Sequence, residues 1–202
     1  TITQYHWRSS VDGTLSNSAV FNTTSLSVGN HTIYFKVKDN DTLWSTAVSS
    51  SIRINAYPVV VITSITPNPA YRNDLNGTTT YFNSSSSDSD GSVTNYYWNS
   101  SKDGTLSNSG SFTTSVNTLS LGNHTISLRV RDNDGAWSTA TSYIMVKSYP
   151  NATINSISHT VAHNGTQVTF NGTGSDQDGS ITGYHWRSSI DGTLSNSAVF
   201  ST

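Results

Sequence analysis

Polar and apolar residues alternate along many short stretches of this chain, which is typical of strands with one buried and one exposed face. The clearest stretch is 124–131, in which Ile126, Leu128 and Val130 fall on one face between polar residues. An equivalent stretch occupies 31–38. Since no stretch shows a convincing helical period, the alternation predicts an all-β protein.

Turn residues divide the middle of the chain into about seven short strands, the number expected for an immunoglobulin-like β-sandwich. Tyr-Pro pairs at 57–58 and 149–150 bracket this region. We expect strands at 59–62, 78–84, 93–98, 110–114, 124–131 and 142–147, an Asp-Gly turn with flanking strand residues within 100–106, an irregular connection at 67–77 and a polar loop at 85–92.

The sequence repeats itself. The stretch 184–200 recurs almost unchanged at 5–21 and in diverged form at 96–112, so that Trp7, Trp98 and Trp186 are 91 and 88 residues apart. This spacing suits one sandwich per repeat. We predict a complete repeat at 57–148, preceded at 1–56 by the C-terminal part of a repeat and followed at 149–202 by the N-terminal part of another.

Composition excludes several classes of protein. The net charge is -2 with only 11% charged residues, which leaves no basic surface of the kind that nucleic acid requires. No apolar run approaches the roughly 18 residues of a membrane span. There is no Cys, so a disulfide or a thiolate metal site cannot form.

Three motifs together resemble the PKD domain, the immunoglobulin-like module named for polycystic kidney disease proteins. They are the segment Asp88-Ser89-Asp90-Gly91-Ser92-Val93-Thr94-Asn95-Tyr96-Tyr97-Trp98, its copy at 176–186, and the Gly-Asn-His-Thr-Ile strand that ends in Asp-Asn-Asp-Gly. The Trp-Asp-Phe-Gly-Asp-Gly signature of many members is replaced here by Trp98-Asn99-Ser100-Ser101-Lys102-Asp103-Gly104. The resemblance implies tandem PKD-type sandwiches that act in spacing, adhesion or assembly without catalytic activity.

Asp residues gather in the predicted turns. All 12 acidic residues are Asp, and all but Asp74 fall in three turn motifs. One interpretation is turn chemistry, in which Asp accepts local amide hydrogen bonds and Gly supplies a positive φ. The other is calcium, because the two acidic loops lie at the same end of such a sandwich and carboxylate oxygens suit Ca²⁺. The predicted ligands, at the junction with the preceding repeat, are Asp88, Asp90, Asp132 and Asp134. No motif requires a cofactor, so Ca²⁺ is the one ion expected.

The His and Ser residues are better explained by the repeat than by a catalytic or metal site. His31 and His124 occupy equivalent places, while His6 and His185 alternate with core aromatics and correspond to Tyr97 in the middle copy. No Ser lies in a Gly-x-Ser-x-Gly elbow, and no unique Ser, His and Asp set stands outside the repeated motifs. A weak surface metal site at His159 and His163 has no support from spacing.

Aromatic residues fall into two groups. We expect the core to contain Trp7, Tyr96, Trp98, Trp137 and Trp186, rather than these rings forming sugar-stacking platforms. Alternation points Tyr34, Tyr97 and Tyr143 outward, where they are candidates for contact with a neighbouring molecule or a glycan.

The Asn-x-Ser/Thr sequence of N-glycosylation occurs ten times, at Asn22, Asn30, Asn40, Asn76, Asn83, Asn99, Asn123, Asn151, Asn164 and Asn171. If the protein is exported, we expect several of these sites to carry glycans.

Two functions fit these patterns. The first is an extracellular or cell-surface structural module, a tandem array that builds a filament, sheath, surface layer or adhesin stalk by self-association of neighbouring copies. The second is a carbohydrate-binding accessory region of a secreted hydrolase.

Overall fold

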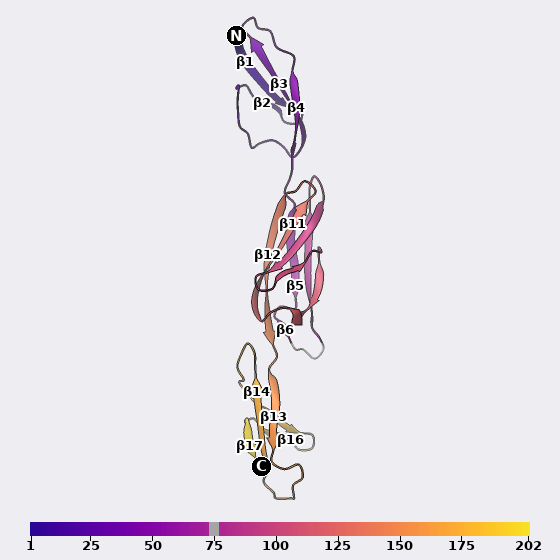
Figure 1. Cartoon of the computed structure of the whole chain (residues 1–202), viewed down its shortest axis with the longest axis vertical. Helices are drawn as coiled ribbons and strands as arrows, with labels where there is room; N and C mark the ends of the chain where they lie inside the picture. The colour runs from indigo at the N-terminus through magenta and orange to yellow at the C-terminus, as the bar shows by residue number, and fades with distance from the viewer. Residues whose placement is uncertain (73–76) are drawn as a thin grey trace.

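A computed structural model describes residues 1–72 and 77–202 and shows three groups of strands along one long axis, with the two termini at opposite ends (Figure 1). Within these residues the one helical segment is the 3₁₀ turn η1 (Val116–Thr118), and no helix is long and apolar enough to cross a membrane. The all-β fold class is confirmed.

The middle group is a sandwich of two sheets. One sheet has the order β10-β7-β5, and the other has the order β6-β12-β11-β8-β9. Their bounds are β5 (Val59–Thr66), β6 (Ala70–Arg72), β7 (Thr79–Ser87), β8 (Val93–Ser100), β9 (Gly104–Ser107), β10 (Phe112–Ser115), β11 (Gly122–Asp132) and β12 (Trp137–Ser148).

Side chains that alternate inward from both sheets form the core of the middle sandwich. Ile126, Leu128 and Val130 of β11 are fully buried, as the sequence pattern predicts. Trp98 of β8 is also fully buried and meets Phe82 edge to face, with ring centroids 5.8 Å apart. The indole Nε1–H of Trp98 donates to a backbone carbonyl at 2.9 Å, so this buried ring keeps its polar group satisfied.

The outer groups repeat parts of the middle one. The first has the strand order β2-β1-β3-β4, the same as β9-β8-β11-β12. The third forms the sheet β13-β14-β17 and the pair β15-β16. Their bounds are β1 (Ile2–Ser9), β2 (Gly13–Ser16), β3 (Gly29–Asp39), β4 (Val48–Ile54), β13 (Asn151–Ile157), β14 (Thr169–Ser175), β15 (Trp186–Ser188), β16 (Gly192–Ser195) and β17 (Val199–Ser201). The repeat boundaries stay predictions.

The strands are longer and more numerous than the pattern indicates. In the described part of the middle sandwich there are eight strands, because β6 lies within the predicted irregular connection and pairs in parallel with β12. In addition, β7 runs to Ser87, into the predicted polar loop. The part of this connection at 73–76, which includes Asp74 and Asn76, lies outside the described residues.

The Asp-Gly turns have the predicted geometry. Gly13, Gly104 and Gly192 follow the Asp in each copy and have φ angles of 74°, 71° and 75°. A residue with a Cβ atom is strained in this region, which explains why all three copies place Gly there.

Candidate functional site

The two acidic loops meet at the end of the middle sandwich that faces the first group of strands. The loop between β7 and β8 carries Asp88 and Asp90, and the loop between β11 and β12 begins at Asp132 and includes Asp134. The side chain of Asn133 joins them, because its Oδ1 accepts a hydrogen bond from the Ser92 amide at 2.6 Å. We call these four aspartates and the chain that enters between them the first junction.

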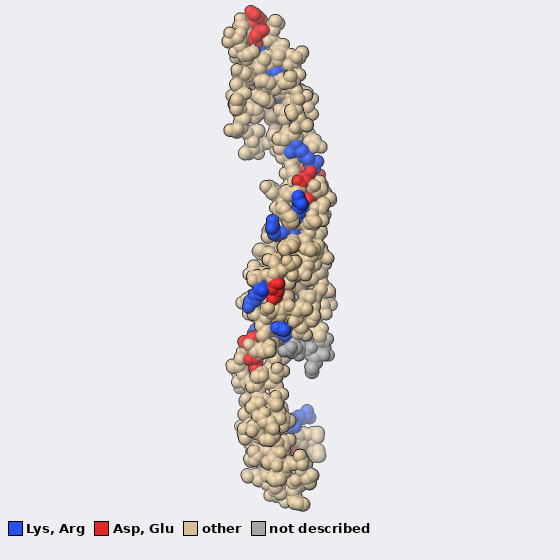
Figure 2. Space-filling model, in the orientation of Figure 1, with Lys and Arg blue, Asp and Glu red and all other residues tan. Residues whose placement is uncertain are grey.

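The segment that enters the first junction is held by the aspartates. The guanidinium of Arg53 lies 2.6 Å from Asp134 and 3.3 Å from Asp90. The side chain of Asn55 donates to Asp132 at 2.8 Å, and the amide of Ala56 donates to Asp90 at 3.2 Å. Figure 2 shows acidic and basic side chains meeting at this narrow part of the molecule. The acidic loops therefore bind the linker between two repeats.

Asp132 has a lowered pKa although it is 2% exposed. Burial acts to raise this pKa, but it is outweighed by hydrogen bonds from the Asn55 side chain and from backbone amides after the strand. Two of those amides, of Asp134 and Ala136, donate to the same carboxylate oxygen at 2.9 and 2.8 Å. Since these donors favour the charged form, Asp132 is an anion that fixes both its own loop and the linker.

Asp88 differs from its three neighbours. Both of its carboxylate oxygens are buried, and neither has a hydrogen-bond partner with ordinary distance and angle among the described residues. Burial raises the pKa of Asp88 and outweighs the lowering effect of the Asp90 backbone amide, and the nearby charges of Asp90 and Asp132 raise the pKa further. This carboxylate is the least stabilised charge at the first junction.

A second junction repeats the contact. Ser148, the last residue of β12, donates its amide to Asp178 at 2.8 Å and its hydroxyl to Asp178 at 2.6 Å and Asp176 at 3.0 Å. These hydrogen bonds lower the pKa of Asp178. Ser148 and Ala56 each directly precede a Tyr-Pro pair, and Asp178 and Asp90 each end an Asp-x-Asp motif. The two junctions therefore use one design.

The structure brings Asp88, Asp90, Asp132 and Asp134 to one pole, where sequence reasoning expects them. Calcium binding there stays a prediction. Among the described residues, no three or more His or Asp side chains are arranged to hold a metal ion, and the Arg53 guanidinium supplies the cation that faces Asp90 and Asp134.

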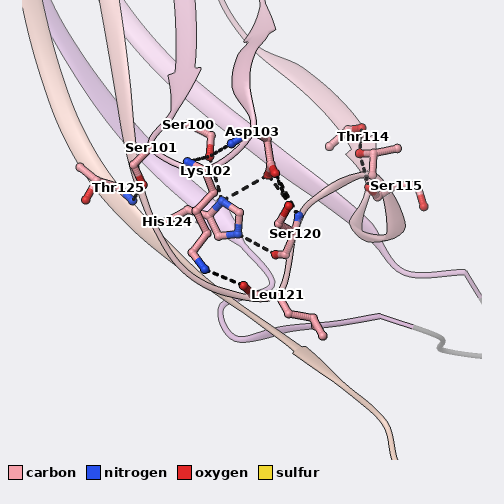
Figure 3. Close-up of polar contacts among 11 residues, drawn as sticks. Ser100, Ser101, Lys102, Asp103, Thr114, Ser115, Ser120, Leu121, His124 and Thr125 are labelled. Atoms are coloured by element: carbon pink, nitrogen blue, oxygen red, sulfur yellow. Dashed lines mark hydrogen bonds and ion pairs between the residues drawn. The ribbon is translucent and has the colours of Figure 1, made fainter. Parts of the chain in front are cut away.

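A buried cluster of Ser, His and Asp lies at the other end of the middle sandwich (Figure 3). The Ser100 hydroxyl and the His124 Nδ1 atom are 2.8 Å apart, and the His124 Nε2–H donates to the Ser120 carbonyl at 2.7 Å. Asp103 Oδ2 lies 3.3 Å from the same Nδ1 atom. Because a carbonyl can only accept, Nε2 carries the hydrogen of the bond to Ser120.

This cluster does not have the geometry of a catalytic triad. In a triad the imidazole presents opposite ring nitrogens to Ser and Asp, whereas Ser100 and Asp103 both face Nδ1 of His124. Ser100 and His124 are also only 2% and 1% exposed. The first repeat has the same contacts at 2.7 Å between Ser9 and His31. The cluster connects a turn, a loop and a strand in the first and middle repeats, which agrees with the structural interpretation of both His residues.

The remaining His residues are less buried, with His6 half-buried and His185 exposed. His6 and His185 each lie near one Asn side chain, at 3.3 and 3.2 Å. His159 is exposed with its ring near the Ser158 hydroxyl, and His163 is exposed in the same loop.

The prediction for one core aromatic is wrong. Trp98 is fully buried, and Trp7, Tyr96 and Trp186 are half-buried on inner faces, but Trp137 is 39% exposed. Trp137 lies on the outer face of its sheet, with the Arg129 guanidinium 4.7 Å from its ring centroid. The outward Tyr residues are confirmed, since Tyr34, Tyr97 and Tyr143 are all exposed.

Most candidate glycosylation sites are accessible. The Asn side chain is exposed at Asn22, Asn30, Asn40, Asn83, Asn123, Asn151 and Asn164 and half-buried at Asn99 and Asn171, while Asn76 lies outside the described residues. Glycosylation stays a prediction at all ten positions.

Comparison with known proteins gives one family match. A profile described as the K319L-like PKD domain matches residues 74–146, within the predicted complete repeat. No curated protein matches the chain.

The solved structures that are similar to the chain include the following three. The fibronectin(III)-like modules of Clostridium thermocellum CbhA are 19% identical over 73% of this chain and 79% of that one, with a TM-score of 0.39. The PKD1 domain of Vibrio anguillarum Epp is 25% identical over 48% of this chain and 100% of that one, with a TM-score of 0.37. Three N-terminal domains of the highly immunogenic outer capsid protein of bacteriophage RB49 are 19% identical over 98% of this chain and 69% of that one, with a TM-score of 0.39.

Proposed function

We propose that this chain, whose middle repeat is a PKD-type domain, is a stiff spacer segment of an extended extracellular array. PKD-type domains are generally non-catalytic extracellular modules. The array would serve as part of a filament, sheath, surface layer or adhesin stalk, in which neighbouring repeats or copies associate.

The observation that carries this proposal is the repeated junction. Each linker is short, with four residues between β4 and β5 and two between β12 and β13. At each junction the residue before the Tyr-Pro pair donates its backbone amide to the second Asp of the Asp-x-Asp motif in the next repeat, at 3.2 Å from Ala56 and at 2.8 Å from Ser148. A linker that is bonded at its end to the following repeat has few conformations left, so successive repeats stay aligned.

Aromatic packing supports the second junction further. Tyr149 of the linker stacks on Tyr71, with ring centroids 5.0 Å apart and an interplanar angle of 28°. Tyr71 belongs to β6, which pairs with the end of β12 next to the linker. The linker is thus held both by the repeat before it and by the repeat after it.

We predict that removing Asp90 and Asp178, which accept the amide hydrogen bonds at the two junctions, makes the chain more flexible. In solution X-ray scattering, the chain should have the narrow cross-section and long maximum dimension of an extended particle. The double variant Asp90→Ala, Asp178→Ala should keep its strand content by circular dichroism but scatter as a broader, more compact ensemble.

The matched control is Asp39→Ala. Asp39 occupies in the first repeat the position of Asp132 but contacts the loop residue Leu43 within its own repeat, at 2.9 Å. This variant should scatter like the unmodified chain. A spacer role would be refuted if the unmodified chain were as flexible as the double variant.

A further inference from the structure

The outer face of the sheet in the first repeat gathers basic and aromatic side chains. On the paired strands β1 and β3, His6 lies opposite Lys36 and Arg8 lies opposite Tyr34. Trp44 covers one end of this row, with the Lys36 ammonium 4.5 Å from its ring centroid and the His6 ring 6.2 Å away. We call these five residues the basic face.

The basic face contains a hollow of about 470 Å³, lined by His6, Arg8, Ser10, Tyr34, Lys36 and Ala47. The side chains of His6, Arg8, Tyr34 and Lys36 are basic or aromatic, and Ser10 contributes a hydroxyl. A hollow of this size is in the range of small-ligand sites, which are generally about 300 to 1,000 Å³.

The cations that border the hollow are free to meet an anion. Among the described residues, neither Arg8 nor Lys36 has a carboxylate within 4.0 Å. The ion pairs that Arg or Lys forms in this part of the chain are those of Arg53. The two side chains project from diagonal positions of one antiparallel pair, about 7 to 8 Å apart at the backbone. A single carboxylate is therefore within reach of both.

The aromatic rings supply flat apolar surface beside the charges. Tyr34 is 38% exposed and Trp44 is 41% exposed. Exposed rings of this kind pair an apolar face with a polar edge. A ligand that matches the basic face should therefore carry a negative charge and the flat apolar face of a ring in the same small molecule or in one monomer of a polymer.

We propose that the basic face binds an acidic polysaccharide, through sugar units that carry a carboxylate. The carboxylate would lie between Arg8 and Lys36, and the ring of the same or the next sugar would lie against Tyr34. Nucleic acid fits less well, because the cations form one cluster on a chain with a net charge of -2 rather than the extended stripe that a phosphate backbone follows.

The second repeat provides an internal comparison. In the same register, Tyr97 pairs with Arg129 and Asn99 pairs with Ser127. The stack of Arg129 on Trp137 is retained, at 4.7 Å, but Asn99 and Ser127 stand where the first repeat has Arg8 and Tyr34. The second repeat therefore keeps a cation and an aromatic ring but lacks the pair that lines the hollow, and we assign no site to it.

This binding role goes beyond the spacer role and does not depend on it, since the basic face lies away from both junctions. Arg187 in the third copy repeats Arg8 after 179 residues, so an array that also repeats Tyr34 and Lys36 would present the site at intervals. Spaced weak sites on one rod would raise the affinity for a long polymer.

The test is affinity electrophoresis of the full chain in gels that contain polygalacturonate, dextran or poly-glutamate. We expect polygalacturonate to retard the chain, dextran to leave it unretarded, and poly-glutamate to retard it less. The double variant Arg8→Asn, Tyr34→Ser places in the first repeat the residues that the second repeat has at the equivalent positions, Asn99 and Ser127. It should bind polygalacturonate about tenfold more weakly, the loss expected for one charge-assisted contact.

Two controls complete the experiment. Arg129→Gln removes a cation from the second repeat and should leave the affinity unchanged, whereas Asn99→Arg, Ser127→Tyr should strengthen binding. Circular dichroism checks that each variant is folded. Equal binding of the Arg8→Asn, Tyr34→Ser variant and the unmodified chain would overturn the proposal, as would retardation by dextran or by poly-glutamate equal to that by polygalacturonate.

Discussion

The ionised side chain of Asp88 destabilises the fold that surrounds it. Its carboxylate oxygens are buried and have no hydrogen bond of ordinary distance and angle among the described residues, and the charges of Asp90 and Asp132 lie nearby. Because its pKa is raised in the folded chain, the ionised group destabilises the fold at neutral pH. That destabilisation is relieved as the pH falls through the raised pKa.

We therefore predict that Asp88→Asn raises the melting temperature at pH 7 in the presence of a chelator. Asp176→Asn is the matched control at the second junction. It should not stabilise the chain, because Asp176 already accepts a hydrogen bond from Ser148 at 3.0 Å. A melting temperature of Asp88→Asn at or below that of the unmodified chain would contradict this account.

The unmodified chain and the Asp88→Asn variant also test the prediction that calcium binds at the first junction. If Ca²⁺ binds at the first junction, it should raise the melting temperature of the unmodified chain and have a smaller effect on Asp88→Asn, which lacks one carboxylate. If calcium leaves the melting temperature and the calorimetric signal of the unmodified chain unchanged, the site does not exist.

At the scale of the strand and the turn, His124 is the residue that joins separate elements. Its ring links Ser100 at the end of β8 to the Ser120 carbonyl before β11, at 2.8 and 2.7 Å. Replacing it by Phe would remove the ring partner of the Ser120 carbonyl and of the buried Ser100 hydroxyl, which would keep only the amides of Lys102 and Asp103 at 3.2 Å. Each such loss costs about 1 to 3 kcal/mol at a buried site.

We predict that His124→Phe lowers the free energy of unfolding of the middle repeat by about 2 to 4 kcal/mol. Hydrogen exchange at the amides of β11 measures this loss within one repeat. His185→Phe is the control, because His185 is exposed, and its effect should stay within about 0.5 kcal/mol. Unchanged exchange rates in His124→Phe would show that the cluster does not hold the elements together.

Alternation along a strand was sufficient to predict the fold and part of the site. The buried residues of β11 and the meeting of Asp90 with Asp134 at one pole follow from the period of two and from the arrangement of loops in a sandwich. The PKD resemblance also rests on these turn and strand motifs, and the family match confirms it.

What the sequence did not predict depends on strand register and on contacts between repeats. Trp137 lies opposite Arg131 on β11, and only this register shows that the ring belongs to the outer face. The position of Arg53 between two acidic loops depends on how the linker enters the next repeat. The short strand β6 forms because β12, far away in the sequence, offers it an edge. Local patterns contain none of this information.

At the scale of the whole molecule, the stiffness of the second junction should depend on pH. Hydrogen bonds from the Ser148 hydroxyl and amide lower the pKa of Asp178 below its usual value of 3.8. A lowered pKa means that the charged form stabilises the junction at pH values above 3.8. That stabilisation is lost as the pH falls through the pKa of the folded chain.

We expect the third repeat to remain aligned with the second at pH 6 and to move freely once the pH is below the lowered pKa of Asp178 in the folded chain. The chain has no natural Cys, so dyes attached through Thr141→Cys and Asn164→Cys, both exposed positions, can report the angle between these repeats by energy transfer. Asp178→Asn should give the broad low-pH distribution already at pH 6, with little further change on acidification. Circular dichroism at each pH separates loosening of the junction from unfolding of the strands. A narrow distribution at both pH values in the unmodified chain, with its strands intact, would show that the Ser148–Asp178 contact does not hold the repeats in line.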